Sequence, residues 1–431
     1  MSHAGPLTAP DDDDAAAAAA PPPIRFAALQ VPEFRWYWLT SWISSTGDGM
    51  ENVIRGLLVV QLVGLGAAPF WLGMMVFAHW VPFTLFSLYG GALADRYDNR
   101  KVQIVAQLLL MTAAFGVAAA TLTGIVTEWW IFGLLLVHGF AGAIGGPAQQ
   151  TLIHSLVGRE RLLSAVSLNS TARQLSQVIG PAVAGFIYLQ FGPGWGLVVN
   201  GLTFVPLLVF LAFFIRLAPK AKIAPQPVLE ALREGIAFVR SRPRIGGLIG
   251  VEMLPVIFLG HTFNSLLVLF ATDYLRAGTL GYSFLLVASG LGALAAAVWM
   301  AYARQRGDPA RIIVGAAVVE VLAILVFALS TSYVLSLLLM VAIGAATVLT
   351  QSFNNTALQL SAPDRIRGRV MGAYSFGTQG FRVLNGPLLG VLATVLTPPL
   401  AVAGSALVVL GGLTGIVALV PQLRRKDGPA V

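Results

Sequence analysis

Long apolar stretches separated by short polar connections constrain this chain more than any other feature of its sequence. A helix needs about 20 mostly apolar residues to cross a membrane. Stretches of that kind lie near residues 36–63, 70–94, 102–124, 129–153, 163–189, 195–216, 246–274, 281–303, 311–330, 333–356, 371–396 and 399–421. Charged residues make up only 11% of the chain, too few to cover a water-soluble protein of this size. The sequence therefore predicts an all-α polytopic membrane protein with twelve transmembrane helices.

The lysine and arginine residues fall almost entirely on one side of this array. All but four of the 27 lie in tails or connections that would share one face of the membrane. The exceptions are Arg276 on the opposite side and three residues inside spans, Arg55, Arg173 and Arg382. Because connections rich in lysine and arginine stay in the cytoplasm, we expect both termini to be cytoplasmic. The expected location is a bacterial inner or plasma membrane.

Polar segments suggest how the chain divides into domains. Residues 1–33 contain four consecutive aspartates, an alanine run and three consecutive prolines, a composition that predicts a disordered cytoplasmic tail and not a signal peptide. The predicted division continues with a six-helix bundle, a cytoplasmic linker, a second six-helix bundle and a cytoplasmic tail at 34–216, 217–245, 246–421 and 422–431. Within the linker, the stretch from Val228 to Val239 is either an amphipathic helix on the membrane surface or a simple connection.

An internal repeat relates the two predicted bundles. A shift of 206 residues superposes a glycine–proline pair, two arginines and a serine: Gly180, Pro181, Arg159, Arg161 and Ser155 fall on Gly386, Pro387, Arg365, Arg367 and Ser361. Two similar six-helix halves related along the membrane normal are typical of one large class of secondary transporters. In that class the binding site lies near the membrane midplane, between the halves.

The connection after the second span reads GGALADRYDNRKV from Gly90 to Val102, and it resembles the signature of the major facilitator superfamily. The matching positions are Gly91, Asp95, Arg96, Arg100 and Lys101, whereas Asp98 and Asn99 depart from the signature. The resemblance implies that this loop gates the inward face. The residue chemistry allows Gly91 to pack closely against a helix and Asp95 to cap or pair with a helix end, while the arginines stay in water. The alternative is that the loop has no gating role and that its basic residues only keep it on the cytoplasmic side of the membrane.

Further stretches narrow the resemblance. FRWYWLTSWISSTGDG leads into the first span, residues 147–185 cover the fourth and fifth spans, FVRSRPRI leads into the seventh, and GYSFLLVASGLGAL opens the eighth. Over residues 29–421 the chain is similar to a drug:proton antiporter branch that includes the enterobactin exporter and macrolide efflux proteins. Gly180, Pro181 and Gly185 also resemble a fifth-helix motif of antiporters. Proline frees a backbone carbonyl and glycine lets a neighbouring helix approach, which makes this a bendable gate position.

Sequence motifs for other functions are missing. The chain has no cysteine, and it contains neither a GxxxxGKS or GxxxxGKT phosphate loop nor an HExxH zinc motif. An ATP-driven pump would need a partner chain. A membrane enzyme is disfavoured because the chain has no carboxylate cluster at metal-ligand spacing. We therefore expect a protein that is not an enzyme and that needs no cofactor or metal.

Charged residues inside spans are costly and usually functional. Asp48, Glu51 and Arg55 are spaced to share one face of the first span. Together with Glu252 on the seventh span they form the predicted proton-coupling group. A structural ion pair between packed helices is the alternative for Glu51 and Arg55, and function and structure are equally favoured for Glu252. Glu320 is expected to be structural.

The resemblance implies that the first, fourth, seventh and tenth spans line a central cavity, and polar residues at helical spacing support this. The predicted cavity residues are Asn52, His138, Gln149, Arg173, His261, Asn264, Gln351, Asn354, Asn355 and Arg382. Arg173 and Arg382 are expected to pair with acids across the halves or to bind an anionic substrate. His79 beside Trp80, and His154, are expected to have no role.

These features together predict a secondary transporter that exports a small amphipathic molecule, such as a drug-like compound or a siderophore, by proton antiport with alternating access. Its partners would be the substrate, protons and the bilayer, without nucleic acid, and we expect a monomer. A uniporter or importer of a polar metabolite, or a lysolipid flippase, would use the same fold. A channel is disfavoured, because the repeat and the mid-helix hinges imply a rocking carrier.

Overall fold

The computed structural model describes residues 26–215, 228–302, 308–363 and 366–423. Within these parts every regular element is helical and no strand occurs. Most of the predicted N-terminal tail lies outside the described residues. Its last part belongs to the fold, since the short helix η1 (Ala27–Gln30) buries Ala28, whose N–H donates a 3.2 Å hydrogen bond to Ser164 Oγ.

The first half contains three helical elements that make six membrane-crossing segments. The elements are α2 (Pro32–Arg96), α3 (Asn99–Leu122) and α4 (Glu128–Phe213). The backbone of α2 leaves the helical conformation at Gly64, with φ of 72°, and that of α4 does so at Gly158 and Gly192, with φ of 71° and 78°. Glycine adopts positive φ without a steric penalty, so the chain turns at these residues. Thus α2 supplies two segments, α3 one and α4 three.

The second half also contains six segments, two of which are broken in the middle. Its elements are α5 (Val228–Arg240), α6 (Pro243–Phe258), α7 (Gly260–Leu269), η2 (Phe270–Tyr274), α8 (Gly278–Tyr302), α9 (Pro309–Leu329), α10 (Tyr333–Ser361), α11 (Arg367–Gly380), α12 (Arg382–Val395), α13 (Pro398–Leu419) and η3 (Pro421–Leu423). One segment runs through α6, α7 and η2, with a break at Leu259, and another through α11 and α12, with a break at Phe381. The helix α5 resolves the open question about the linker in favour of a helix.

The described residues contain nine helical stretches that are long and apolar enough to span a membrane. Two of them, Pro32–Ser87 and Glu160–Phe213, are 56 and 54 residues long and turn at Gly64 and Gly192. Each therefore crosses twice, since about 20 residues suffice for one crossing. With the broken segment of α11 and α12, the described part of the chain makes twelve crossings, and the predicted fold class is confirmed.

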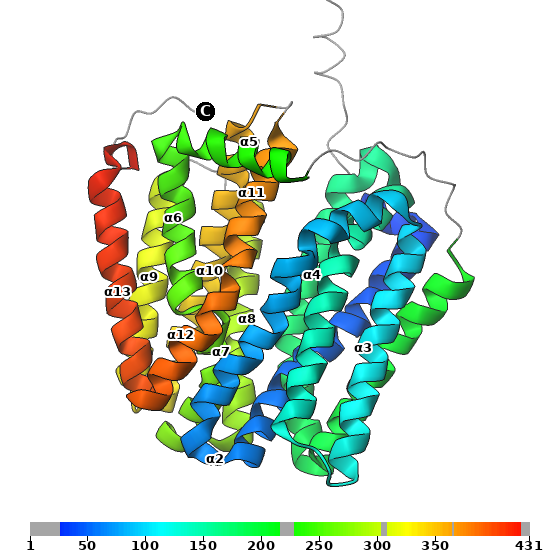
Figure 1. Ribbon diagram of the computed structural model, residues 1–431, viewed down its shortest axis with the longest axis vertical. Helices are drawn as coiled ribbons and strands as arrows, with labels where there is room; N and C mark the ends of the chain where they lie inside the picture. The colour runs from blue at the N-terminus through cyan, green and yellow to red at the C-terminus, as the bar shows by residue number, and fades with distance from the viewer. Residues whose placement is uncertain (1–25, 216–227, 303–307, 364–365, 424–431) are drawn as a thin grey trace, which may run out of the picture.

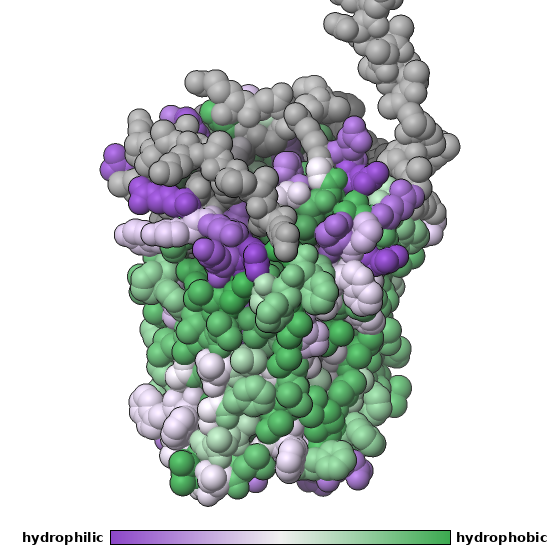
Figure 2. Space-filling view, turned by 90° about the vertical axis from the view of Figure 1, so that its right-hand side faces the viewer, coloured by the Kyte–Doolittle hydropathy of each residue, from purple (hydrophilic) through white to green (hydrophobic). Residues whose placement is uncertain are grey.

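The two halves stand side by side as helix bundles, with α5 lying across one end of the second bundle (Figure 1). We call this end of the molecule the basic face, because Arg96, Arg100, Arg240 and Arg369 lie at the helix ends there. On the face seen in Figure 2, apolar residues cover the middle of the molecule, and most hydrophilic residues gather toward the basic face. This distribution is that of a protein whose waist lies in lipid.

Equivalent helices meet closely in both halves. In the first half, a β-carbon on Gly139 would lie 1.9 Å from the backbone oxygen of His79, so α2 and α4 touch backbone to backbone. In the second half, a β-carbon on Gly344 would lie 1.9 Å from the backbone oxygen of Ser289, so α8 and α10 touch in the same way. These contacts join the second span to the fourth and the eighth to the tenth, as the internal repeat requires.

Candidate functional site

A cavity of about 290 Å³ lies between the two halves. The first half contributes residues of α2 and α4 to its wall, and the second half contributes residues of α7 and α8. Six residues of the predicted proton-coupling and cavity groups line it: Asp48, Asn52, Arg55, His138, His261 and Asn264. Pro181 of the predicted hinge also reaches the wall. The structure thus brings the charged face of the first span together with the polar faces of the fourth and the seventh.

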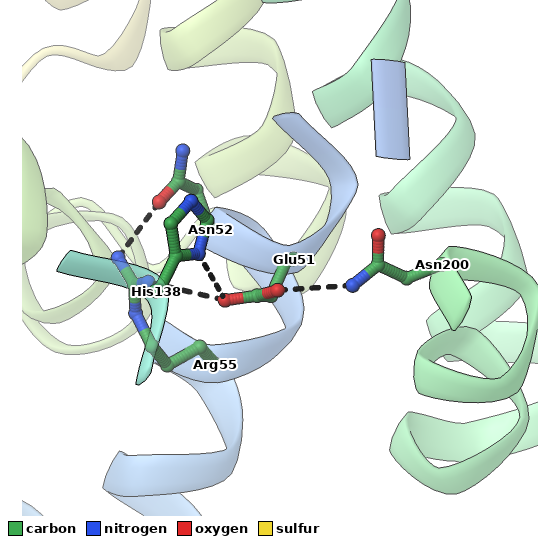
Figure 3. Close-up of polar contacts among 5 residues, drawn as sticks. All are labelled: Glu51, Asn52, Arg55, His138 and Asn200. Carbon is green, nitrogen blue, oxygen red and sulfur yellow. Dashed lines mark hydrogen bonds and ion pairs between the residues drawn. The ribbon is translucent and has the colours of Figure 1, made fainter. Parts of the chain in front are cut away.

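Glu51 is the centre of a polar cluster beside this cavity (Figure 3). Its Oε1 atom lies 3.5 Å from His138 Nδ1 and 3.6 Å from Arg55 Nη1, while its Oε2 atom accepts a 2.9 Å hydrogen bond from Asn200 Nδ2. Arg55 in turn donates a 2.7 Å hydrogen bond to Asn52 Oδ1. Only 2% of the Glu51 side chain is exposed. The cluster therefore surrounds a buried carboxylate with cationic and amide groups from three segments of the first half.

The cluster leaves several buried polar atoms without a hydrogen-bond partner in the described part of the protein. They are Asp48 Oδ1, Glu51 Oε1, His138 Nδ1 and Asn200 Oδ1. Glu51 Oε1 and His138 Nδ1 lie 3.5 Å apart, within ion-pair distance, but form no hydrogen bond. A buried acceptor without a donor costs about 1–3 kcal/mol, so the unpaired oxygens of Asp48 on the cavity wall and of Glu51 off the wall both favour a donor. A proton or a hydrogen-bond donor on a bound molecule would satisfy them.

Glu252 is also buried, but it belongs to a different network. Tyr374 Oη lies 3.0 and 2.8 Å from its two carboxylate oxygens and donates its one proton to this carboxylate, and Asn354 Nδ2 donates a hydrogen bond of 2.6 Å. These contacts join α6, α10 and α11 away from the cavity wall. Glu320 on α9 similarly accepts a 2.8 Å hydrogen bond from Thr347 on α10, a contact between packed helices that agrees with the structural role expected for it.

The two remaining intramembrane arginines do not form the expected pairs. Among the described residues, neither Arg173 nor Arg382 makes an ion pair with a carboxylate, and Arg173 is exposed and off the wall. Arg382 begins α12 directly after the break at Phe381. From there its Nη1 atom lies 2.5 Å from His261 Nε2, and its guanidinium lies over the ring of Trp80.

Four other predicted cavity residues, Gln149, Gln351, Asn354 and Asn355, are off the wall. The tenth span contributes nothing to it because Gly344 of α10 packs against the backbone of Ser289, and Ser289 itself lines the cavity. At this level α8 therefore stands between α10 and the cavity. Asn355 instead accepts a 2.5 Å hydrogen bond from Gln359 on its own helix.

Several wall residues are not among those predicted from the sequence, and the most informative are His79, Trp80 and Tyr282. His79, which was expected to have no role, lines the cavity, and so does its neighbour Trp80, for which the sequence made no prediction. The His79 ring lies 5.0 Å from the His138 ring, and the Trp80 ring lies 5.3 Å from the His261 ring. A signal was present, because a polar ring inside an apolar span needs a polar partner within the protein. His154 is exposed and off the wall.

The signature loop is built differently from the expectation. A β-carbon on Gly91 would meet nothing within 4 Å, whereas one on the adjacent Gly90 would lie 2.1 Å from the backbone oxygen of Ala143. Gly90, and not Gly91, is thus the point of close packing, because it faces α4. Arg96 and Lys101 are exposed, and Asp95 lies in α2, but its side chain is outside the described part of the protein.

Arg100 of this loop does not stay in water. Its Nε atom donates a 2.5 Å hydrogen bond to the backbone oxygen of Leu211, and its Nη2 atom donates to that of Ala212. These carbonyls lie at the end of α4, where backbone acceptors have no partner within the helix and the helix dipole favours a cation. Arg100 therefore fastens the start of α3 to the end of α4.

The predicted hinge in the fifth span makes two kinds of contact. A β-carbon on Gly180 would lie 2.8 Å from Gly49 Cα within the first half, and one on Gly185 would lie 2.4 Å from Ser283 Oγ of the second half. Another close contact between the halves joins Gly73 of α2 to the backbone of Gly386 in α12. Gly73 and Gly185 are each within about three turns of a loop on the side away from the basic face. The halves are thus in tight contact on that side of the cavity.

Twelve crossings in two related halves, with a polar cavity between them, define a membrane transporter of the major facilitator type. A family model described as "transmembrane secretion effector" matches residues 24–430, and the chain belongs to this family. Two curated relatives are the enterobactin exporters EntS of Shigella flexneri and of Citrobacter koseri. The first is 26% identical over 412 residues, which cover 93% of this chain and 95% of the relative. The second is 27% identical over 410 residues, covering 92% and 94%.

Solved structures show the same fold. A POT family transporter in complex with 5-aminolevulinic acid matches with a TM-score of 0.70 at 12% identity, covering 91% of this chain and 96% of that one. The nucleoside transporter NupG matches with a TM-score of 0.69 at 16% identity, covering 90% and 98%. At these identities the likeness concerns the fold alone. The resemblance to the major facilitator superfamily and to the enterobactin exporter is confirmed.

Proposed function

We propose that this protein exports a small amphipathic, siderophore-like compound by proton antiport with alternating access. The relatives named as enterobactin exporters support export and this substrate class. The observation that carries the coupling is a pair of buried carboxylates, Asp48 on the cavity wall and Glu51 beside the cavity, each with an oxygen that has no hydrogen-bond partner in the described residues.

The cavity wall suits an amphipathic molecule. Trp80 and Tyr282 offer ring faces, Leu286 and Met75 offer apolar contact, and Asn264 is an exposed polar group. Binding sites for small molecules usually combine apolar walls with a few polar anchors in this way. A compound with aromatic or aliphatic parts and hydrogen-bond donors would contact both kinds of surface.

Competition for the carboxylates provides the coupling. When Asp48 and Glu51 are ionised, the Oε1 atom of Glu51 holds Arg55 and His138, and the unpaired Oδ1 atom of Asp48, a residue of the cavity wall, accepts a donor from the substrate. When protons occupy these oxygens, those acceptors are lost and Arg55 is released from its ion pair. Proton and substrate therefore bind alternately, which is the requirement for antiport. Glu252, which accepts hydrogen bonds from Tyr374 and Asn354, is the further carboxylate that we propose takes part in proton coupling.

Alternating access follows from rocking of one half against the other, as in transporters built from two repeats. Tight contacts on the side away from the basic face would open, and the halves would close at the basic face, which we place in the cytoplasm. One proton moving through a potential of ~150 mV releases roughly 3.4 kcal/mol. That energy sustains about a 300-fold gradient of a neutral substrate. We propose that a single chain carries out the cycle.

Proteoliposomes loaded with enterobactin or with a fluorescent amphipathic dye, under an imposed pH gradient, test the proposal. We expect substrate movement opposite to the proton gradient, accompanied by a pH change in the lumen, and its loss when an uncoupler is added. Retained pumping after the gradient collapses would exclude proton coupling. Counterflow without any pH change would instead indicate a uniporter, and movement of a labelled lysolipid alone would indicate a flippase.

A further inference from the structure

We infer that Trp80 is a positioning residue that connects the Glu51 cluster of the first half to Arg382 of the second half. This inference rests on the proposed proton-coupled function and concerns how the coupling crosses between the halves. Trp80 lies on the second segment of α2, inside the first half, yet it contacts two side chains of the second half.

The contacts on the second-half side are specific. The guanidinium carbon of Arg382 lies 4.8 Å from the centre of the Trp80 ring, a cation–π distance. The His261 ring lies 5.3 Å from the same ring at an interplanar angle of 30°, and its Nε2 atom is 2.5 Å from Arg382 Nη1. Trp80 is only 9% exposed. Tryptophan, histidine and arginine thus form one packed group across the interface.

Both second-half partners lie directly after a helix break. His261 is the second residue of α7, after the break at Leu259, and Arg382 is the first residue of α12, after the break at Phe381. Breaks in these two spans are the places where α7 and α12 have freedom to change direction relative to α6 and α11. Any such movement changes the positions of His261 and Arg382 relative to Trp80.

On the first-half side, the neighbouring residue His79 continues the line toward the carboxylate. The His79 ring lies 5.0 Å from the His138 ring, and His138 Nδ1 lies 3.5 Å from Glu51 Oε1. The backbone of His79 is held against α4, where Gly139 leaves no room for a β-carbon. Side chains in contact therefore extend from Glu51 to Arg382, with His79 and Trp80 adjacent in the chain as the link.

Energetic coupling between distant groups is transmitted through side chains in contact. The row of side chains from Glu51 to Arg382 supplies such contacts between the two halves. A change in the partners of Glu51 alters the position of His138 and, through His79 and Trp80, the site that Arg382 occupies. Loss of a cation–π contact shifts an equilibrium by about threefold at an exposed site and by up to about thirtyfold at a desolvated one. Trp80 is buried, whereas Arg382 is only half-buried, so we expect a shift between these two limits.

The chain contains no cysteine, so a pair of introduced cysteines reports the distance between the halves without background. Tyr97 and Leu360 are exposed at the basic face, one in each half. Spin labels on Tyr97→Cys and Leu360→Cys, read by pulsed EPR in liposomes at several pH values, give the populations of the open and closed states. The same liposomes give the number of protons exchanged per substrate.

For Trp80→Leu we expect a change in the ratio of the two states of about threefold to thirtyfold and fewer protons per substrate, while Trp80→Phe keeps most of both. Trp195→Leu, at an exposed tryptophan of α4, is the matched control and should behave as the unsubstituted protein. If Trp80→Leu does not fold, Arg382→Gln is compared with Arg382→Lys, and the glutamine variant alone should lose coupling. State populations and proton ratios unchanged in the folded leucine or glutamine variant would overturn the inference. Absence of proton exchange in the unsubstituted protein would instead refute the proposed function.

Discussion

Asn200 donates a hydrogen bond of 2.9 Å to Oε2 of Glu51, and both side chains are buried inside the first half. The two residues are 149 positions apart, on the last segment of α4 and the first segment of α2. This bond orients the carboxylate so that its other oxygen faces His138 and Arg55 (Figure 3). One carboxylate thus serves both packing of the helices and, in our proposal, transport.

Replacing Glu51 by glutamine should stop proton-coupled export. Glutamine keeps the size of the side chain but neither releases a proton nor forms an ion pair with Arg55, so we expect pH-driven substrate movement to fall at least tenfold. Combining it with Asp48→Asn should leave no pH-driven movement. Proteoliposome flux measures this, with Glu160→Gln, at an exposed acid of α4, as the control. Unchanged flux in the double variant would refute the coupling scheme.

Replacing Asn200 by alanine should destabilise the first half. The substitution removes a donor from a buried carboxylate oxygen, which costs about 1–3 kcal/mol. Thermal unfolding in detergent should show a lower melting temperature than for Asn264→Ala, whose side chain is exposed in the cavity. Equal melting temperatures for the two variants would mean that the Asn200 bond adds no stability.

An added methyl group at Gly386 should force the halves apart. The new β-carbon would lie 2.3 Å from the backbone oxygen of Gly73, which cannot move without shifting a whole helix. We expect Gly386→Ala to disfavour the state with tight contacts away from the basic face and to reduce transport strongly. Spin-label distances measured on that side check this. The control is Gly404→Ala, where nothing lies within 4 Å of the added β-carbon. The control should be neutral or stabilised by up to about 1 kcal/mol.

Replacing Arg100 by alanine tests whether the signature loop acts through structure. Its guanidinium bonds to the carbonyls of Leu211 and Ala212 are charge-assisted, so we expect a loss of about 1–3 kcal/mol of stability and a lower melting temperature. Lys101→Ala, at an adjacent exposed residue, should leave stability unchanged. A variant of Arg100 with normal stability and reduced transport would show that this residue acts in gating and does not fasten α3 to α4.

Some site residues were within reach of sequence reasoning. Asp48, Glu51 and Arg55 stand at spacings that place them on one helical face, and charges inside a span must meet partners or water. His138, His261 and Asn264 follow from polar spacing on spans implied by the family resemblance. Asn200 was not predicted, because a lone asparagine near a helix middle has no local sign of which distant side chain it meets.

Other residues were placed wrongly or missed because their position depends on helix rotation and on breaks. Gln351, Asn354 and Asn355 read as a cavity face, yet close packing of Gly344 on Ser289 puts α8 in front of α10. Trp80 and Arg382 meet across the halves at the point where α12 begins after Phe381. Gly90 and Gly91 are indistinguishable in the sequence, and only one of them faces α4.

The sequence by itself determined that the chain lies in a membrane, how often it crosses and that it consists of two related halves, because bilayer thickness sets segment length and duplication leaves a constant offset between matching residues. The tertiary structure alone decided which buried groups face one another. Helix rotation, glycine contacts and the breaks at Leu259 and Phe381 set those directions, and they arise from packing between residues far apart in the chain, for which no local pattern exists.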